Sequence, residues 1–343
     1  MRGLRISATY LLVAVIVVLA AALFIRLVGS DVARAFTGFF RGAFGSLYGM
    51  SEVLVRATPL MLAGLGVSIG FSSGFFNIGA EGQLYMGATA AAAVGVFLPG
   101  LPAGLLLPLA ILASLAAGAA WSAIPGLLKA RFGLSEVINT IMFNYIAINI
   151  VGILVRTALK DPNYPLPMSP EMPDAMTLPT LIEGTRLHAG LLVGLAAAVV
   201  VFVLMRKTPI GFTMRVVGLN PRAARVAGIS VSANIILASC LSGSLAGAAG
   251  AVEVAGIHHK LLEGISPGFG YMAIVVSLLG RNNPAGIVGA AMGIAVLQVG
   301  SMSMQRLAGV PTSISWILMG LLVLLILGRT TIFRFLLPEG ARQ

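Results

Sequence analysis

Long uninterrupted apolar stretches recur along this chain, and they restrict its fold more than any other feature. A bilayer core needs roughly 20 apolar residues in a helix that rises about 1.5 Å per residue. Only helices and closed barrels satisfy every backbone polar group in lipid, and barrel strands would alternate apolar with polar residues. Because these stretches are continuous, the sequence predicts an all-α polytopic membrane protein.

We expect about ten transmembrane helices in a single transmembrane domain that covers residues 1–343. Residues 31–50 are expected to be amphipathic or interfacial rather than spanning, and the segment 268–280 is short enough for a broken or tilted helix. The first apolar run is too long for a signal peptide, so we expect an uncleaved span there. The predicted spans are 6–28, 53–74, 82–98, 103–127, 134–155, 188–205, 233–256, 268–280, 284–303 and 311–328.

The composition supports lipid as the solvent, since 58% of the residues are hydrophobic and only 10% are charged. The net charge of +11 does not indicate nucleic acid, because the bases are spread over short loops between apolar runs. The loop 206–232 contains bases and no acid, which predicts a cytoplasmic position. The proline-rich stretch 156–187 balances acids against bases and is expected outside. Alternation of the loops then places both termini in the cytoplasm.

Residues 53–155 and residues 233–328 each hold four predicted spans, and the two sets enter the membrane from opposite sides. Such a pair is an inverted repeat, which is a common plan for transporters. We therefore predict two four-span halves, joined by the loop 206–232.

The most distinctive local motif covers residues 74–88, with the sequence GFFNIGAEGQLYMGA, between two apolar runs. Asn77 is expected to cap the following helix, and Glu81 would lie in its first turn, where the helix dipole favours a carboxylate. A tightly packed structural turn and a gate or pathway lining, which would include Gln83, explain the motif equally well. An ionisable residue inside a membrane domain favours the functional explanation.

Further polar residues lie inside or beside two other predicted spans. Asn139 and Asn144 lie in the span 134–155, where amides must face protein or water, and hydrogen bonding between helices is the simpler explanation for them. Ser266 and Pro267 precede the short span 268–280. Half-helix N-termini of this kind often point at substrate in transporters, although an ordinary helix start accounts for either residue.

The basic loop 206–232 carries helix signals that a passive tether would not need. Asn220 and Pro221 predict the start of a short helix, and Gly228 predicts its end. Such a cytoplasmic helix can dock into a groove on a partner protein. The positive-inside rule alone explains the arginines of this loop but not the cap signals.

No catalytic or metal-binding pattern is recognisable. His188, His258 and His259 lack metal-site spacing, the lone Cys240 lies in an apolar run, and no Gly-Lys pair that a P-loop would need occurs. The sequence therefore predicts neither an enzyme nor a metal protein.

Three stretches resemble one known family: residues 76–83 (FNIGAEGQ), 135–147 (SEVINTIMFNYIA) and 218–229 (GLNPRAARVAGI). They resemble the permease subunits of bacterial ABC importers of the ribose, simple-sugar and nucleoside class, which are related to branched-chain amino-acid permeases. With the layout of the spans, the resemblance covers most of the chain. The Glu-Gly-Gln of the first stretch resembles the nucleoside branch most. At Asn139 a small residue such as Thr would be usual for the family.

The resemblance implies a fold of the cobalamin-importer type and a second permease, identical or homologous. It also implies two ATPase subunits, which would use ATP while this chain binds no cofactor itself. A periplasmic or lipid-anchored binding protein would deliver the substrate. The helix that contacts the ATPases would be residues 219–228, with Gly218, Asn220, Arg222, Arg225 and Gly228 in its motif.

The leading hypothesis is thus the permease subunit of an ATP-driven importer that translocates a nucleoside or a simple sugar. The alternative is a secondary active transporter coupled to an ion gradient. That alternative needs an ionisable relay in the spans, for which Glu81 and Glu253 are the candidates, and it leaves the basic loop unexplained.

Overall fold

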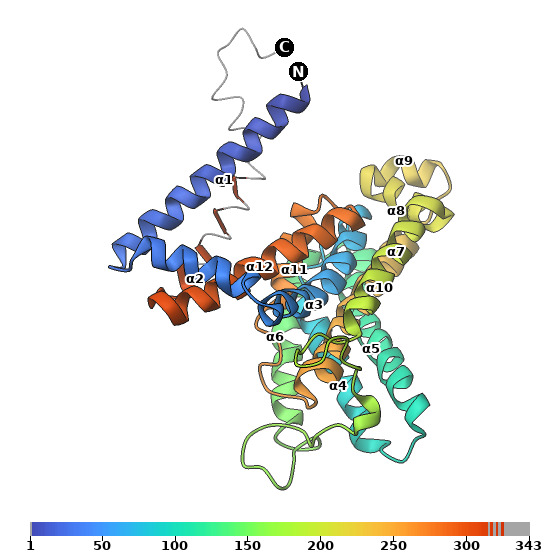
Figure 1. The fold of residues 1–343 in the computed structure, drawn as a ribbon. Helices are drawn as coiled ribbons and strands as arrows, with labels where there is room; N and C mark the ends of the chain where they lie inside the picture. Colours follow the sequence, from blue (N-terminus) through green and yellow to red (C-terminus); the bar gives the residue numbers. More distant parts are fainter. Residues whose placement is uncertain (1, 315, 318–319, 322–323, 326–343) are drawn as a thin grey trace. The chain divides into compact units, whose positions relative to one another are not determined.

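The computed structural model describes residues 2–314, 316–317, 320–321 and 324–325 (Figure 1). These residues fall into two compact units, one formed by the described parts of 1–53 and 292–343 and the other by residues 54–291. The elements are α1 (Arg2–Leu27), α2 (Val32–Phe44), α3 (Leu47–Ser72), α4 (Ala80–Phe97), α5 (Ala103–Phe132), α6 (Glu136–Leu154), η1 (Asp174–Met176), α7 (Gly190–Lys207), α8 (Pro209–Leu219), α9 (Pro221–Val226), α10 (Val231–Glu253), η2 (Val254–His258), α11 (Phe269–Leu279) and α12 (Pro284–Ala308).

The described residues are helical apart from loops, a few turns and two isolated β-bridges, so the prediction of an all-α membrane protein is confirmed. Among the described residues, six helices are long and apolar enough to cross a membrane: α3, α5, α6, α7, α10 with its continuation η2, and α12. The count of ten stays a prediction, as does the inverted repeat. The predicted span 311–328 lies partly outside the described residues.

Small residues bring the central helices of the unit 54–291 into close contact. Helices α4, α5 and α10 pack against one another (Figure 1). A Cβ atom on Gly87 of α4 would overlap the backbone of Gly247 of α10, and one on Gly118 of α5 would overlap that of Gly243. The Ser114 hydroxyl donates a hydrogen bond of 2.7 Å to the Gly87 carbonyl. Such contacts drive helix association where no hydrophobic effect operates between helices.

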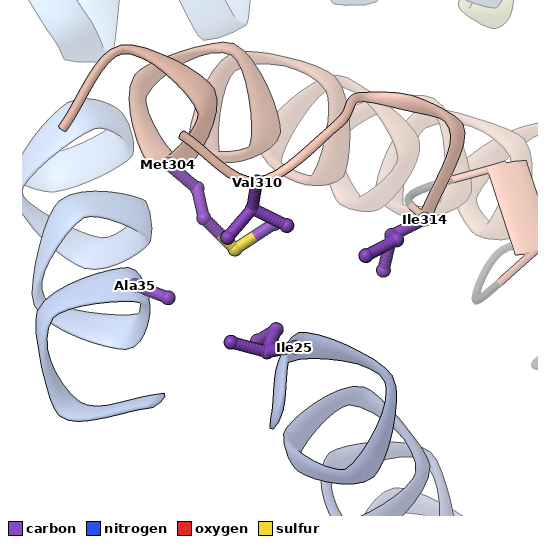
Figure 2. Packing of buried hydrophobic residues seen from close by; sticks show 5 residues of the cluster. All are labelled: Ile25, Ala35, Met304, Val310 and Ile314. Carbon is purple, nitrogen blue, oxygen red and sulfur yellow. The ribbon is translucent and has the colours of Figure 1, made fainter. Parts of the chain in front are cut away.

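The other unit packs α1 and α2 against the end of α12 and the residues that follow. Ile25, Ala35, Met304, Val310 and Ile314 meet there, as Figure 2 shows. Helix α2 is amphipathic and buries small residues, which confirms the prediction for its part of residues 31–50. The span that follows begins at Leu47, earlier than predicted, because α3 extends beyond its most apolar stretch.

The predicted external stretch is irregular but well packed, and we call residues 156–189 the strap. Backbone hydrogen bonds tie it to the segment that follows α10. Met172 donates to the His259 carbonyl at 2.7 Å, and Leu178 donates to the Ala255 carbonyl at 2.8 Å. Three of its own side chains, Met168, Met172 and Met176, are buried. Flexible methionine side chains suit a packed segment that has no regular backbone.

Two elements differ from a simple series of spans. Helix α11 has 11 residues, and at 1.5 Å per residue it is only about 16 Å long, roughly half of a bilayer core. This matches the expectation of a broken helix at 268–280. The loop 206–232 contains α8 in addition to the predicted helix. Its start signals, Thr208 as cap and Pro209 at the first position, repeat the pattern at Asn220 and Pro221.

Candidate functional site

Asn77 and Gln83 form a reciprocal amide pair at the start of α4. The Asn77 Nδ2 donates to Gln83 Oε1 at 2.8 Å, and the Gln83 Nε2 donates to Asn77 Oδ1 at 3.0 Å. Asn77 also donates to the Ser242 hydroxyl of α10 at 2.8 Å. Both amides are fully buried. Buried amides tolerate apolar surroundings only when they are satisfied in this way, so the pair fixes α4 against α10.

The position of Asn77 corrects one sequence-based expectation. Its side chain does not cap α4, which begins after Gly79 and has no side-chain cap. Instead, Asn77 Oδ1 accepts a hydrogen bond from the Gly79 N–H at 2.9 Å, which is an Asx-turn. The side-chain amide of Asn77 thus pairs with Gln83. The rules for helix caps concern only bonds to backbone N–H groups, so they do not predict this partner.

Helix α6 holds the same segment from the other side. Asn144 Oδ1 accepts from the Gly82 N–H at 2.8 Å, and Asn144 Nδ2 donates to the Ile78 carbonyl at 2.9 Å. The Thr140 hydroxyl accepts from the Ile78 N–H at 3.3 Å. Asn144 and Thr140 are completely buried. Together with Asn77, Gln83 and Ser242, they form a set of polar contacts that we call the amide network.

Glu81 lies in the first turn of α4, as predicted, but its carboxylate reaches the N-terminus of α11. Glu81 Oε2 accepts a hydrogen bond of 2.6 Å from the Gly270 N–H. The Ser266 hydroxyl and the N–H groups of Gly268 and Tyr271 also interact with this carboxylate. The side chain is 2% exposed. A helix N-terminus with unsatisfied N–H groups is a suitable partner for a buried carboxylate.

The remaining predicted pathway residues lie beside this contact or farther along α6. Ser266 is buried, and its hydroxyl accepts from the N–H groups of Gly268 and Phe269 at 3.1 and 3.0 Å. Pro267 is exposed. Asn139 is half-buried, and its Nδ2 has no hydrogen-bond partner among the described residues. The structure therefore gathers Asn77, Glu81, Gln83, Asn144 and Ser266 around the start of α4 and leaves Asn139 apart.

The predicted short helix in the loop 206–232 is present as α9. Asn220 Oδ1 accepts from the N–H groups of Arg222 and Ala223 at 3.0 and 3.1 Å, which is the expected cap. Gly228 has φ +76°, a left-handed conformation that ends the helix without strain. Arg222 and Arg225 are exposed. Helix α9 thus presents two guanidinium groups on a short, well-capped element.

Exposed apolar side chains accompany these arginines. Leu219, the last residue of α8, and Val226, the last residue of α9, are 87% and 92% exposed. In contrast, Gly218 lies so close to Ser72 that a Cβ atom there would overlap the Ser72 carbonyl. This surface therefore combines charge and apolar area on its outer side with a tight backbone contact on its inner side.

Sequence reasoning missed an ion pair next to this region. Lys129 Nζ lies 2.6 Å from Glu136 Oε1 and also donates to the Gly74 carbonyl. The lysine lies in the last turn of α5, and the glutamate in the first turn of α6. Opposite charges on either side of the left-handed Gly133 are a signal that could have found this pair, because each charge also suits its helix dipole.

The geometry of the described residues reveals no candidate metal site. In the part of the chain that the structure describes, no three His, Cys, Asp or Glu side chains are grouped so that they could hold an ion. The expectations of no metal and of no cofactor on this chain stay predictions.

Residues 49–327 match the family described as branched-chain amino acid transport system / permease component. The guanosine ABC transporter permease protein NupP of Bacillus subtilis (strain 168) is 39% identical to this chain. The matched region covers 92% of this chain and 91% of the length of NupP. The glucose ABC transporter permease protein TsgB13 of Haloferax volcanii is 38% identical to this chain. The matched region covers 87% of this chain and 80% of the length of TsgB13.

A third relative is the nucleoside ABC transporter permease protein NupB of Lactococcus lactis subsp. cremoris. It is 32% identical over 80% of this chain and 78% of its own length. No solved structure matches the chain.

Proposed function

Because this chain belongs to the branched-chain amino acid transport system / permease component family and is the permease subunit of an ABC importer, we propose that it translocates nucleosides. The observation that carries this proposal is the identity of 39% to a guanosine permease over 92% of the chain. A simple sugar is the second candidate, because a glucose permease is nearly as similar.

We further propose the assembly that surrounds the chain. Two ATPase subunits would dock at α9, a second permease would complete the pathway, and a periplasmic or lipid-anchored binding protein would deliver substrate on the strap side. ATP would be used by the partner subunits. Both termini would lie in the cytoplasm of a cell with the chain in its inner membrane, and the ten-helix fold would be of the cobalamin-importer type.

The geometry supports a mechanism in which α9 receives motion and the amide network responds to it. Interiors are close-packed, so a helix that moves at the surface must move the side chains that it contacts. The network joins α4, α6 and α10 through directional hydrogen bonds, which have few alternative arrangements. In this mechanism, Asn77, Glu81, Gln83, Asn144 and Ser266 line or control the pathway.

The test is uptake by the intact transporter in proteoliposomes, with ATP supplied on the side of the membrane where α9 lies. The transporter is purified with its own ATPase and binding protein, and radiolabelled guanosine and glucose are supplied separately. We expect guanosine uptake that needs ATP and is abolished by vanadate. Glucose uptake alone would favour the second candidate, and uptake that an ion gradient drives without ATP would contradict the proposal.

A further inference from the structure

Phe75 joins the proposed docking helix to the motif at the start of α4. Its side chain is fully buried and packs in one cluster with Val217 of α8, Ala224 of α9 and Ile235 of α10. Ala224 is the buried residue of α9. The inner side of α9 therefore rests on the Phe75 cluster, while its outer side carries the arginines.

Lys129 fixes the backbone immediately before Phe75. Its Nζ donates to the Gly74 carbonyl and to Glu136 Oε1 and lies 5.9 Å from the centre of the Phe75 ring. The side chains of Lys129 and Glu136 are 20% and 15% exposed, so water only partly screens their attraction. This contact ties the end of α3 to the turn between α5 and α6.

The chain between Phe75 and the amide network is very short. The Asn77 N–H donates to the Phe75 carbonyl at 3.0 Å, and the Asn77 side chain enters the network directly. We call residues 74–79 the linker. It has no helical turn of its own, and a Cβ atom on Gly70 of α3 would already overlap the Phe75 carbonyl. A segment held so closely at both ends has little freedom to absorb a displacement.

We propose that the linker transmits displacement of α9 to the amide network, with Phe75 as the contact and Lys129 as the positioning residue that keeps Phe75 in place. The proposal rests on the proposed function, in which ATPases act on α9. If α9 moves, Ala224 must carry the cluster that contains Phe75 with it or open a void, and close packing disfavours the void. Because Phe75 and Asn77 are two residues apart and hydrogen-bonded, the motion reaches Gln83, Ser242 and α6.

A reporter on the linker tests this without knowledge of the substrate. Phe76 is half-exposed, so the variant Phe76→Cys, made with Cys240→Ser, offers one thiol for a maleimide probe. The complex is purified by a tag from its own membranes and labelled without nucleotide or after trapping with ATP and vanadate. In this parent protein we expect a several-fold difference in the labelling rate between the two states.

Three further variants in the parent examine the contacts. Lys129→Met and Phe75→Ala should each remove most of the ATP-dependent difference, while the ATPase subunits still co-purify and hydrolyse ATP. Lys129→Arg keeps a donor and should retain the difference. Arg131→Met is the matched control, since Arg131 is an exposed base at the same end of α5. Lys129→Met is the decisive variant if Phe75→Ala fails to fold.

The outcomes separate this inference from the proposed function. The same ATP response in Lys129→Met as in the parent would overturn the inference, and so would a parent that binds its ATPase yet shows no response. If no ATPase co-purifies with the parent at all, the proposed function itself is wrong. If the response is lost while the amount of folded complex stays the same, lower abundance cannot explain the loss. A purely structural role of Lys129 would instead lower the amount of folded complex.

Discussion

Glu81 of α4 and Gly270 of α11 are joined by a hydrogen bond of 2.6 Å, although 189 positions separate them in the chain. A carboxylate from one helix thereby occupies the N-terminus of another. One interpretation of the sequence was that the half-length helix α11 directs its free N–H groups at substrate, and an ordinary helix start was the other. In this structure the Gly270 N–H donates to Glu81 and the Phe269 N–H donates to the Ser266 hydroxyl, so a substrate that used these groups would have to compete with both side chains.

The first prediction concerns Glu81→Gln. Glutamine keeps the size of the side chain but removes the charge and adds an N–H₂ group that cannot accept from the Gly270 N–H. Hydrogen bonds to charged groups are worth about 1.5–3 kcal/mol, and about 1.4 kcal/mol corresponds to a factor of ten. We expect ATP-dependent uptake to fall at least about tenfold, as measured with radiolabelled guanosine in proteoliposomes.

The control for this variant is Glu263→Gln. Glu263 is exposed and pairs with Arg156 at 2.6 Å, and exposed pairs contribute little. Uptake by Glu263→Gln should stay near that of the unaltered protein, and immunoblots should give the membrane abundance of both variants. If Glu81→Gln lowers only abundance and not uptake per molecule, then Glu81 has a structural role alone.

The positions of the helices were largely predictable from the sequence, whereas their partners were not. Apolar runs bounded by loops predicted the positions of helices such as α6, α7 and α10, because lipid demands continuous apolar helices. The pairing of Glu81 with α11 depends on how helices cross, which no local pattern records. The same holds for Asn77. Its position before a helix is typical of a cap, but its side-chain amide pairs with Gln83.

A second prediction concerns the contact between α4 and α10. A Cβ atom on Gly87 would overlap the Gly247 backbone, which side-chain rotation cannot relieve, so Gly87→Ala must push the helices apart. Overpacking of this kind typically costs about 1–3 kcal/mol. We expect a lower apparent unfolding temperature in detergent and less protein in the membrane.

Gly289→Ala is the matched control for that contact. Gly289 lies in α12, and nothing lies within 4 Å of the place where its Cβ would be. Alanine in a helix is favoured over glycine by roughly 0.5–1 kcal/mol, so stability should be unchanged or slightly higher. Equal stability of both variants would show that the two helices are not in close contact in the membrane.

A third prediction concerns the proposed docking surface. The double variant Arg222→Glu and Arg225→Glu reverses two exposed charges on α9 without touching its buried residue, Ala224. The helix should still form, because its cap at Asn220 is unchanged. We expect normal insertion but loss of co-purified ATPase and of uptake, as measured by pull-down and transport.

The control is Lys207→Glu, which reverses an exposed charge at the end of α7, outside α9. This variant should retain the ATPase and most of the uptake. Normal uptake by the double arginine variant would contradict the assignment of α9 as the docking helix.

Parts of the docking region were accessible to sequence reasoning and parts were not. Asn220, Pro221 and Gly228 predicted α9 because caps and helix ends obey local rules. Phe75 looked like one more apolar residue of a motif, since nothing in its neighbourhood in the sequence reveals that Ala224 rests on it. In the sequence, Lys129 and Glu136 are a base and an acid on either side of Gly133, and only the fold shows that the lysine also reaches the Gly74 carbonyl.

The last prediction concerns His188, which lies in the strap and outside α7, because that helix begins at Gly190 and not at residue 188 as predicted. Burial, and to a smaller extent the neighbouring His259, lowers the pKa of His188 to about 4. Its Nδ1 accepts a hydrogen bond from the Gly190 N–H at 3.2 Å, and a proton on Nδ1 would remove that bond. In the unfolded chain the pKa is near 6.5, so the unfolded state binds more protons between about pH 4 and 6.5.

The contribution of neutral His188 to the free energy of unfolding is therefore fully present above about pH 6.5 and is lost as the pH falls toward 4. Its total is on the order of 3 kcal/mol. We expect the apparent unfolding temperature in detergent to fall between pH 7 and 4.5. His188→Asn keeps an acceptor near Nδ1 but cannot be protonated, so its decline should be shallower. His258→Gln, at a half-buried histidine 3.5 Å from Glu253, controls for general acid effects. The same decline in His188→Asn as in the unaltered protein would mean that other groups dominate acid unfolding and that His188 titrates near its ordinary pKa.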